Sequence, residues 1–309
     1  MSLSIPRTRA RARARRSALP LPGEPRYEVL PLPGVLDAVE DLPAGAVVTV
    51  TSSPRRGVEA TIELAEDLAA RGFRAVPHLA ARQITDDGEL ANFIARLDVA
   101  GVRDVFVVGG DATEPTGQFA SGLDLLRVMA AIGHPFEHVG VPSYPEGHPL
   151  IDDDTLWAAL TAKQRYATYT VTQMCFDAAT VCRFIAEARR RGITLPVVAG
   201  VPGVVDTAKL LRVSLRIGIG DSVRFIRGNR SALTRLLHPG GYRPDSLVRD
   251  LSARAIAGRC DLVGLHVYTF NHVGPSVQRL ARSPIHETEV AECPSPRTSR
   301  SRATPSSNH

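Results

Sequence analysis

Glu28 is the first residue in the chain whose type and position suggest chemistry, because it lies inside an otherwise apolar run at residues 27–32. Apolar surroundings disfavour the charged form of a carboxyl group, so a sheltered glutamate can act as a general acid near neutral pH. A glutamate on an edge strand, or one paired with a buried base, explains the same position. Glu28 is therefore a candidate proton donor with a structural alternative.

A second carboxylate, Asp111, follows the glycine pair Gly109 and Gly110 at the end of another apolar run. Adjacent glycines allow a ligand to approach the backbone closely, and Asp111 would then face the ligand. A turn aspartate that caps the next segment is the competing interpretation, and position alone favours it.

Tyr144 and His148 lie in a loop at residues 144–149 that contains two prolines. The prolines stiffen the loop and present the two rings as a fixed pair. Histidine can serve proton transfer or metal binding, but no second histidine or carboxylate stands at a metal-ligand spacing. No metal site is predicted.

Gln173 follows the run at residues 168–172, and its carboxamide offers a donor and an acceptor in one plane, which suits the edge of a heterocycle. Nearby, Asp177 is interpreted as the N-cap of a helix and Cys175 as a packing residue. The last apolar run ends in an aromatic segment at residues 264–271, which is either core or a stacking surface for a ligand.

Eight apolar runs must position these side chains. Several are rich in valine at consecutive positions, which is typical of parallel strands buried on both faces. The runs are residues 27–32, 47–51, 74–79, 105–108, 138–141, 168–172, 195–200 and 262–267. Segments with helical spacing alternate with them at 57–71, 88–100, 119–132, 153–164, 178–191, 206–216 and 246–257. Four glycines are expected just past helix ends, namely Gly72, Gly101, Gly133 and Gly192.

This alternation predicts an α/β fold, either a (β/α)8 TIM barrel or an eight-stranded doubly wound sheet. Two features favour the barrel. No glycine-rich dinucleotide fingerprint follows the first run, and polar residues such as Thr51 and His78 follow several runs instead of gathering at one switch point. We expect a single barrel domain at residues 23–282 between disordered tails at 1–22 and 283–309.

The net charge of +5 comes from the ends of the chain, where the first sixteen residues hold six arginines and no acid. The central part is mildly acidic, which argues against a nucleic-acid-binding face on the domain. The arginine-rich start is interpreted as a disordered tail, with a transit peptide or an RNA tether as alternatives. Apolar runs too short for a membrane span and cysteines without paired spacing favour a cytoplasmic protein.

Taken in order, these motifs resemble the methylenetetrahydrofolate reductase family, with a match from about residue 26 to residue 275. The matching motifs are aromatic-Glu-apolar-apolar-Pro around Glu28, Gly-Asp at 110–111, Tyr-Pro-Glu-x-His-Pro at 144–149, Thr-Gln-x-x-Phe-Asp at 172–177 and Gly-x-His-x-Tyr-Thr-x-Asn at 264–271. Each motif is weak alone, but five in the right order on successive strands are fairly specific.

The resemblance implies a one-carbon enzyme that reduces methylenetetrahydrofolate to methyltetrahydrofolate with NADH or NADPH, in support of methionine synthesis. Glu28 would be the general acid, and Asp111 would stabilise the developing cation and help hold the pterin. Gln173 and Tyr144 would also bind the folate. The residues implied to contact the cofactor are Thr51, His78, Gly110, Tyr144 and His148.

The chain departs from the flavin-dependent members of this family at three points. Gly109 replaces an arginine, Tyr166-Ala167-Thr168 replaces Ala-Gly-Ala, and Ala162 with Lys163 beside it replaces a basic residue. A pyrophosphate needs cationic donors, so these changes weaken an FAD site. The chain therefore resembles a divergent, actinobacterial-type branch that passes hydride from NADH directly to the folate without flavin.

Two other functions stay open at this point. One is a barrel that binds folate or a nucleotide without turnover. The other is a different flavin barrel, such as a proline dehydrogenase-like enzyme. The retention of both Glu28 and Asp111 favours the reductase, since a pure binding protein has no need of a sheltered proton donor. The oligomeric state is not predicted.

Overall fold

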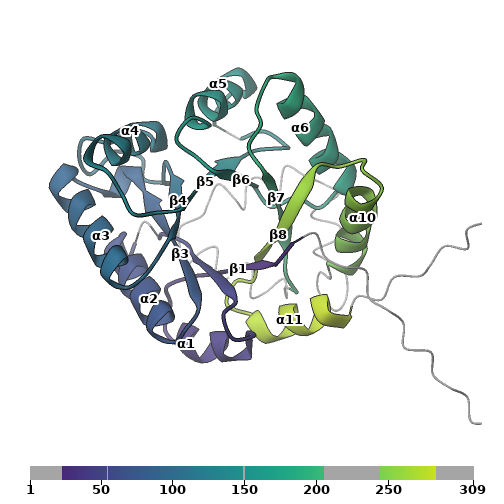
Figure 1. Cartoon of the computed structure of the whole chain (residues 1–309), viewed down its shortest axis with the longest axis horizontal. Helices are drawn as coiled ribbons and strands as arrows, with labels where there is room; N and C mark the ends of the chain where they lie inside the picture. The colour runs from purple at the N-terminus through teal and green to yellow at the C-terminus, as the bar shows by residue number, and fades with distance from the viewer. Residues whose placement is uncertain (1–22, 54, 149, 205–243, 283–309) are drawn as a thin grey trace, which may run out of the picture.

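The computed structural model describes residues 23–53, 55–148, 150–204 and 244–282, and in these ranges eight parallel strands close into a barrel (Figure 1). The strands are β1 Arg26–Val29, β2 Val47–Val50, β3 Arg74–Ala80, β4 Asp104–Val108, β5 His138–Ser143, β6 Tyr169–Thr172, β7 Val197–Pro202 and β8 Leu262–Tyr268. Each strand overlaps one of the eight apolar runs predicted from the sequence. Because β1 pairs with both β2 and β8, the (β/α)8 barrel is confirmed and the doubly wound alternative is wrong.

Helices surround this ring of strands (Figure 1). They are α1 Val35–Ala38, α2 Glu59–Ala70, α3 Asp87–Val99, α4 Gly122–Ile132, α5 Asp153–Lys163, α6 Ala178–Arg190, α10 Asp245–Ile256 and α11 Val273–Arg282. Six of the predicted helices are confirmed, whereas α1 and α11 were not predicted. The predicted helix at residues 206–216 and the predicted tails at 1–22 and 283–309 lie outside the described residues.

The alternation of side chains along the strands divides the core into two layers. In β1, Tyr27 and Val29 belong to the large apolar cluster between strands and helices, so the alternating residues Arg26 and Glu28 point into the barrel. A second, smaller cluster fills the interior of the barrel and consists of Val47, Val76, Phe106, Tyr169, Val171 and Val198. The interior is therefore a packed core, not a pore, as the fold requires.

The predicted helix ends agree with the structure. Gly72, Gly101, Gly133 and Gly192 follow their helices with positive φ, between 75° and 83°, which glycine adopts more readily than other residues. At the start of α6, the carboxylate of Asp177 accepts hydrogen bonds from the backbone N–H groups of two residues in the first turn, at 3.3 and 3.0 Å. The N-cap interpretation of this aspartate is confirmed.

Two cysteines that lie 78 residues apart, Cys182 of α6 and Cys260 just before β8, form a disulfide with a Cα–Cα distance of 5.1 Å. Their spacing along the chain did not predict this pair. Cys175 is buried and free, in agreement with the packing role expected for it. No helix in the described ranges is long and apolar enough to cross a membrane.

Candidate active site

A cavity of about 810 Å³ opens at the carboxyl ends of the strands, where this fold carries its active sites. The structure brings every predicted site residue to its wall. These residues are Glu28, Thr51, His78, Gly110, Asp111, Tyr144, His148 and Gln173. They lie on or just after six different strands, β1 to β6, so residues that are far apart in the sequence meet at one end of the barrel.

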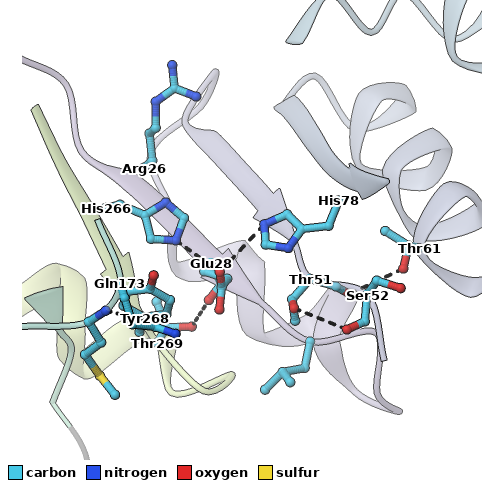
Figure 2. A network of polar contacts seen from close by, with 12 residues as sticks. Arg26, Glu28, Thr51, Ser52, Thr61, His78, Gln173, His266, Tyr268 and Thr269 are labelled. Carbon is cyan, nitrogen blue, oxygen red and sulfur yellow. Dashed lines mark hydrogen bonds and ion pairs between the residues drawn. The ribbon is translucent and has the colours of Figure 1, made fainter. Parts of the chain in front are cut away.

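Glu28 lies between two histidines, one from β3 and one from β8, as Figure 2 shows. Its Oε2 atom is 3.1 Å from Nε2 of His266 on β8 and 3.8 Å from Nε2 of His78 on β3. The glutamate side chain is only 16% exposed. Burial lowers the pKa of His78 to about 4, although the charge of Glu28 opposes this shift, so His78 is neutral near pH 7.

The strand end that carries Glu28 is clamped by the segment that follows β8. The hydroxyl of Thr269 donates a 2.6 Å hydrogen bond to the backbone oxygen of Glu28. The side chain of Asn271 accepts a hydrogen bond of 2.7 Å from the backbone N–H of Leu30 and donates one of 3.0 Å to the backbone carbonyl oxygen of Leu30. Phe270 and Asn271 both have positive φ, 50° and 58°, which costs conformational energy in residues other than glycine. The strain is tolerated where it fixes the position of Glu28.

Asp111 lies exposed at the edge of the cavity, after Gly110. Gly110 has a φ of 91°, and a Cβ atom there would be 3.2 Å from the Cβ of Ala80, so the backbone turn requires glycine. Burial, with a contribution from the negative charge of Asp111, raises the pKa of Tyr144 to about 12. The Tyr144 ring meets the His148 ring edge-on at a centroid distance of 5.4 Å, which confirms that the loop presents the two rings as a pair.

Arg82, which sequence reasoning missed, braces the loop that carries Asp111. Its backbone N–H donates to the carbonyl oxygen of Gly109 at 2.9 Å. Its guanidinium donates to the carbonyl oxygens of Ala112 and Ala120, each at 3.0 Å. The sequence signal that could have identified Arg82 is its position as a basic residue just after the strand that carries His78.

On the opposite part of the wall, Gln173 and Tyr268 present polar and aromatic groups. The side-chain oxygen of Gln173 accepts a 2.9 Å hydrogen bond from the backbone N–H of Met174. The Tyr268 hydroxyl donates to the carbonyl oxygen of Thr172 at 3.2 Å, and a Cβ on Gly200 would lie 2.8 Å from the tyrosine ring. Tyr268 is therefore a fixed part of the cavity wall and not buried in the apolar core.

Few basic side chains line the cavity within the described ranges. Lys163, at the end of α5, is one, and burial lowers its pKa. Arg82 is the other, and its guanidinium is engaged with carbonyl oxygens. Gly109 also lines the cavity, and a Cβ built there would meet nothing within 4 Å, so the fold has room for a side chain that the sequence omits. The described residues contain no cluster of three metal-ligating side chains.

Comparison with known proteins finds relatives that share one description. A family model described as methylenetetrahydrofolate reductase matches residues 35–218. The chain is 26% identical over 284 residues to a probable methylenetetrahydrofolate reductase (NADPH) of Caenorhabditis elegans, covering 84% of this chain and 41% of the relative. It is 25% identical over 209 residues to methylenetetrahydrofolate reductase 2 of Saccharomyces cerevisiae, covering 62% of this chain and 33% of the relative.

A plant relative matches a shorter stretch. The chain is 27% identical over 132 residues to a probable methylenetetrahydrofolate reductase (NADH) of Oryza sativa subsp. japonica, covering 37% of this chain and 22% of the relative. The chain thus spans about two-fifths or less of the length of these curated relatives. Their names give both nicotinamide forms as the reductant.

Proposed function

Because the chain belongs to the methylenetetrahydrofolate reductase family, we propose that its cavity reduces methylenetetrahydrofolate to methyltetrahydrofolate with a hydride from a reduced nicotinamide. One observation carries the proposal. A sheltered carboxyl, that of Glu28, shares a single cavity with Asp111 and Gln173, although the three residues come from distant parts of the chain. The proposal assigns a role to each of them.

In this mechanism Glu28 is the proton donor. Methylenetetrahydrofolate holds its one-carbon unit in a ring between two nitrogens. Transfer of the Glu28 proton to one nitrogen lets the C–N bond break toward that nitrogen, which leaves an iminium ion. Hydride addition to the iminium carbon then gives the methyl group. The negative charge of Asp111 stabilises the cation as it develops, and the amide of Gln173 hydrogen-bonds the pterin edge.

The hydride donor would occupy the side of the cavity lined by Thr51, His78, Gly110, Tyr144 and His148. We infer that hydride passes directly from the nicotinamide to the folate. A tightly held flavin pyrophosphate needs several cationic donors. In the described cavity wall, Arg82 is engaged with carbonyl oxygens, Gly109 lacks a side chain, and Lys163 is left as the cation for a phosphate. A purified protein with stoichiometric flavin absorbance would contradict this inference.

The function is tested by mixing the purified chain with reduced nicotinamide and following its oxidation with and without methylenetetrahydrofolate. We expect oxidation that depends on the folate and that yields methyltetrahydrofolate. Parallel runs with NADH and NADPH identify the preferred donor. A chain that binds the folate without oxidising either nicotinamide would instead be the non-catalytic binding barrel, and the proposed reductase function would be wrong.

A further inference from the structure

The two carboxyl oxygens of Glu28 have different surroundings. Oε2 is the atom that both imidazoles approach, with Nε2 of His266 at 3.1 Å and Nε2 of His78 at 3.8 Å (Figure 2). Within the described part of the chain, no hydrogen bond is made to Oε1, while the side chain as a whole lines the cavity. The oxygen left for a ligand is therefore Oε1.

One tautomer of His266 satisfies this contact in both protonation states of Glu28. With its proton on Nε2, the imidazole donates to Oε2 whether the carboxyl is ionised or carries its own proton on Oε1. With the proton on Nδ1, the buried N–H would lack a partner among the described residues, and Nε2 would face the lone pairs of an ionised carboxylate. The geometry favours the Nε2–H form.

The neighbouring groups keep the cluster otherwise uncharged. His78 stays neutral near pH 7, and its ring lies 4.8 Å from that of Phe106. Tyr268 faces the same carboxyl from β8, and burial together with the charge of Glu28 holds its pKa well above the ordinary value. The Tyr268 ring also meets the His266 ring at 4.8 Å in an edge-on arrangement, which fixes the plane of the imidazole.

We propose that His266 is a positioning residue. Its Nε2–H holds Oε2 of Glu28 throughout the reaction, so that the transferable proton is carried by Oε1 and delivered into the cavity. This inference rests on the proposed function. When the proton leaves Oε1 for the folate nitrogen, the new carboxylate gains a charge-assisted hydrogen bond from His266, and this bond is stronger in the product of the proton transfer than before it.

The test compares two amide substitutions at the same buried site. The amide nitrogen of glutamine can reach the position of Nε2, whereas that of asparagine reaches only the position of Nδ1. We expect H266N to lower kcat by about 10- to 100-fold, as befits a lost hydrogen bond to a charged group. We expect H266Q to recover to within about threefold of the wild type, since it restores the donor.

The pH profile separates positioning from mere packing. Without the donor to Oε2, the ionised form of Glu28 loses stabilisation, so the alkaline limb of the kcat profile should move to higher pH in H266N and by less in H266Q. Equal losses in the two variants, with an unmoved alkaline limb, would overturn the proposal.

A readout without turnover keeps the inference separate from the proposed function. The infrared band of the protonated Glu28 carboxyl, identified as the band that E28Q removes, should titrate at higher pH in H266N than in the wild type or H266Q. An unchanged titration overturns the role of His266 even if the enzyme is active. A shifted titration in a chain that oxidises no nicotinamide supports the positioning role and refutes only the reductase function.

Discussion

Two charged side chains of β1 point into the barrel only two residues apart, and their surroundings differ. Arg26 donates to the Asp104 carboxylate at 2.7 Å and to the Tyr169 hydroxyl at 2.9 Å, and Tyr169 in turn donates to Asp104 at 2.9 Å. The guanidinium also lies 4.2 Å above the centre of the tyrosine ring. Glu28 has two imidazoles beside it, and no lysine or arginine in the described part of the chain forms an ion pair with it.

The contrast separates a structural charge from a chemical one. The cluster of Arg26, Asp104 and Tyr169 is closed, because each charged group has an opposite charge and a hydroxyl within hydrogen-bond distance. Glu28 keeps one oxygen without a hydrogen bond from the described residues. Among these same residues, the buried atoms Nε2 of His78 and Nδ1 of His266 also have no hydrogen-bond partner. Buried polar groups are usually satisfied, so exceptions mark places where a ligand completes the contacts.

The largest stability effect should come from breaking the closed cluster. Asp104→Ala leaves Arg26 buried without its counter-ion, and loss of one partner of such a pair costs about 3–5 kcal/mol of unfolding free energy. Glu28→Gln should change it by less than about 1 kcal/mol, because an amide preserves the volume and still bonds His266. Urea denaturation of both variants measures the difference, and equal losses would erase the distinction between the two clusters.

The cluster of Glu28, His78 and His266, called the open cluster here because Oε1 of Glu28 accepts no hydrogen bond from the described residues, should instead make stability depend on pH. Unfolded His78 titrates near 6.5, and folded His78 near 4, so below pH 6.5 the unfolded chain takes up a proton that the native state refuses. Native stability should therefore fall as the pH drops from 6.5 to 4, with His78 contributing up to about 3 kcal/mol.

Unfolding measured against pH in the wild type and in His78→Leu isolates this contribution. The substituted chain should lose less stability over the same interval, since the other titrating groups are common to both chains. If the unfolding free energy of the two chains changes with pH at the same slope, His78 takes up a proton in the native state as well. The conclusion that His78 stays neutral beside Glu28 would then be wrong.

A smaller effect is expected at the clamp that connects β8 to β1. Asn271→Ala removes two hydrogen bonds to Leu30 and places alanine at a φ of 58°, so we expect a loss of about 2 kcal/mol. Asn271→Gly removes the same bonds without the strain and should lose about 1 kcal/mol. If glycine is the more damaging residue in thermal or urea unfolding, the backbone at this position is not strained.

The smallest effect should come from the start of α6, in the outer layer of helices. Asp177→Ala removes the N-cap of α6 and should cost about 1 kcal/mol, while Asp177→Asn keeps a capping oxygen and should cost only a few tenths. Circular dichroism during urea unfolding gives both values. A loss of several kcal/mol in the alanine variant would show that Asp177 does more than cap the helix.

The sequence predicts the barrel well because its strands are short, valine-rich and separated by amphipathic segments. It fails where a local signal is weak. The four-residue helix α1 is too short for a periodic pattern, and α11 contains Gly274 and Pro275 near its start, which resemble a loop. The disulfide between Cys182 and Cys260 depends on tertiary proximity, which spacing along the chain does not encode.

The site was predictable as a set of residue types but not as a set of contacts. Glu28, Asp111 and Gln173 follow from motifs at β1, β4 and β6, and the structure places them around one cavity. The contact of Glu28 with His266 spans 238 positions, and it appears only when β1 and β8 pair to close the barrel. For the same reason, Thr269 and Asn271 could be recognised as part of a motif but not as the clamp on β1.

The central claim is that Glu28 donates the proton from the open cluster, and the turnover of E28Q at saturating folate and nicotinamide tests it most directly. An amide keeps the shape of the side chain but has no acidic proton, so the account predicts a folded variant whose kcat is reduced by about 100-fold or more. A folded E28Q that turns over at close to the wild-type rate would contradict the account.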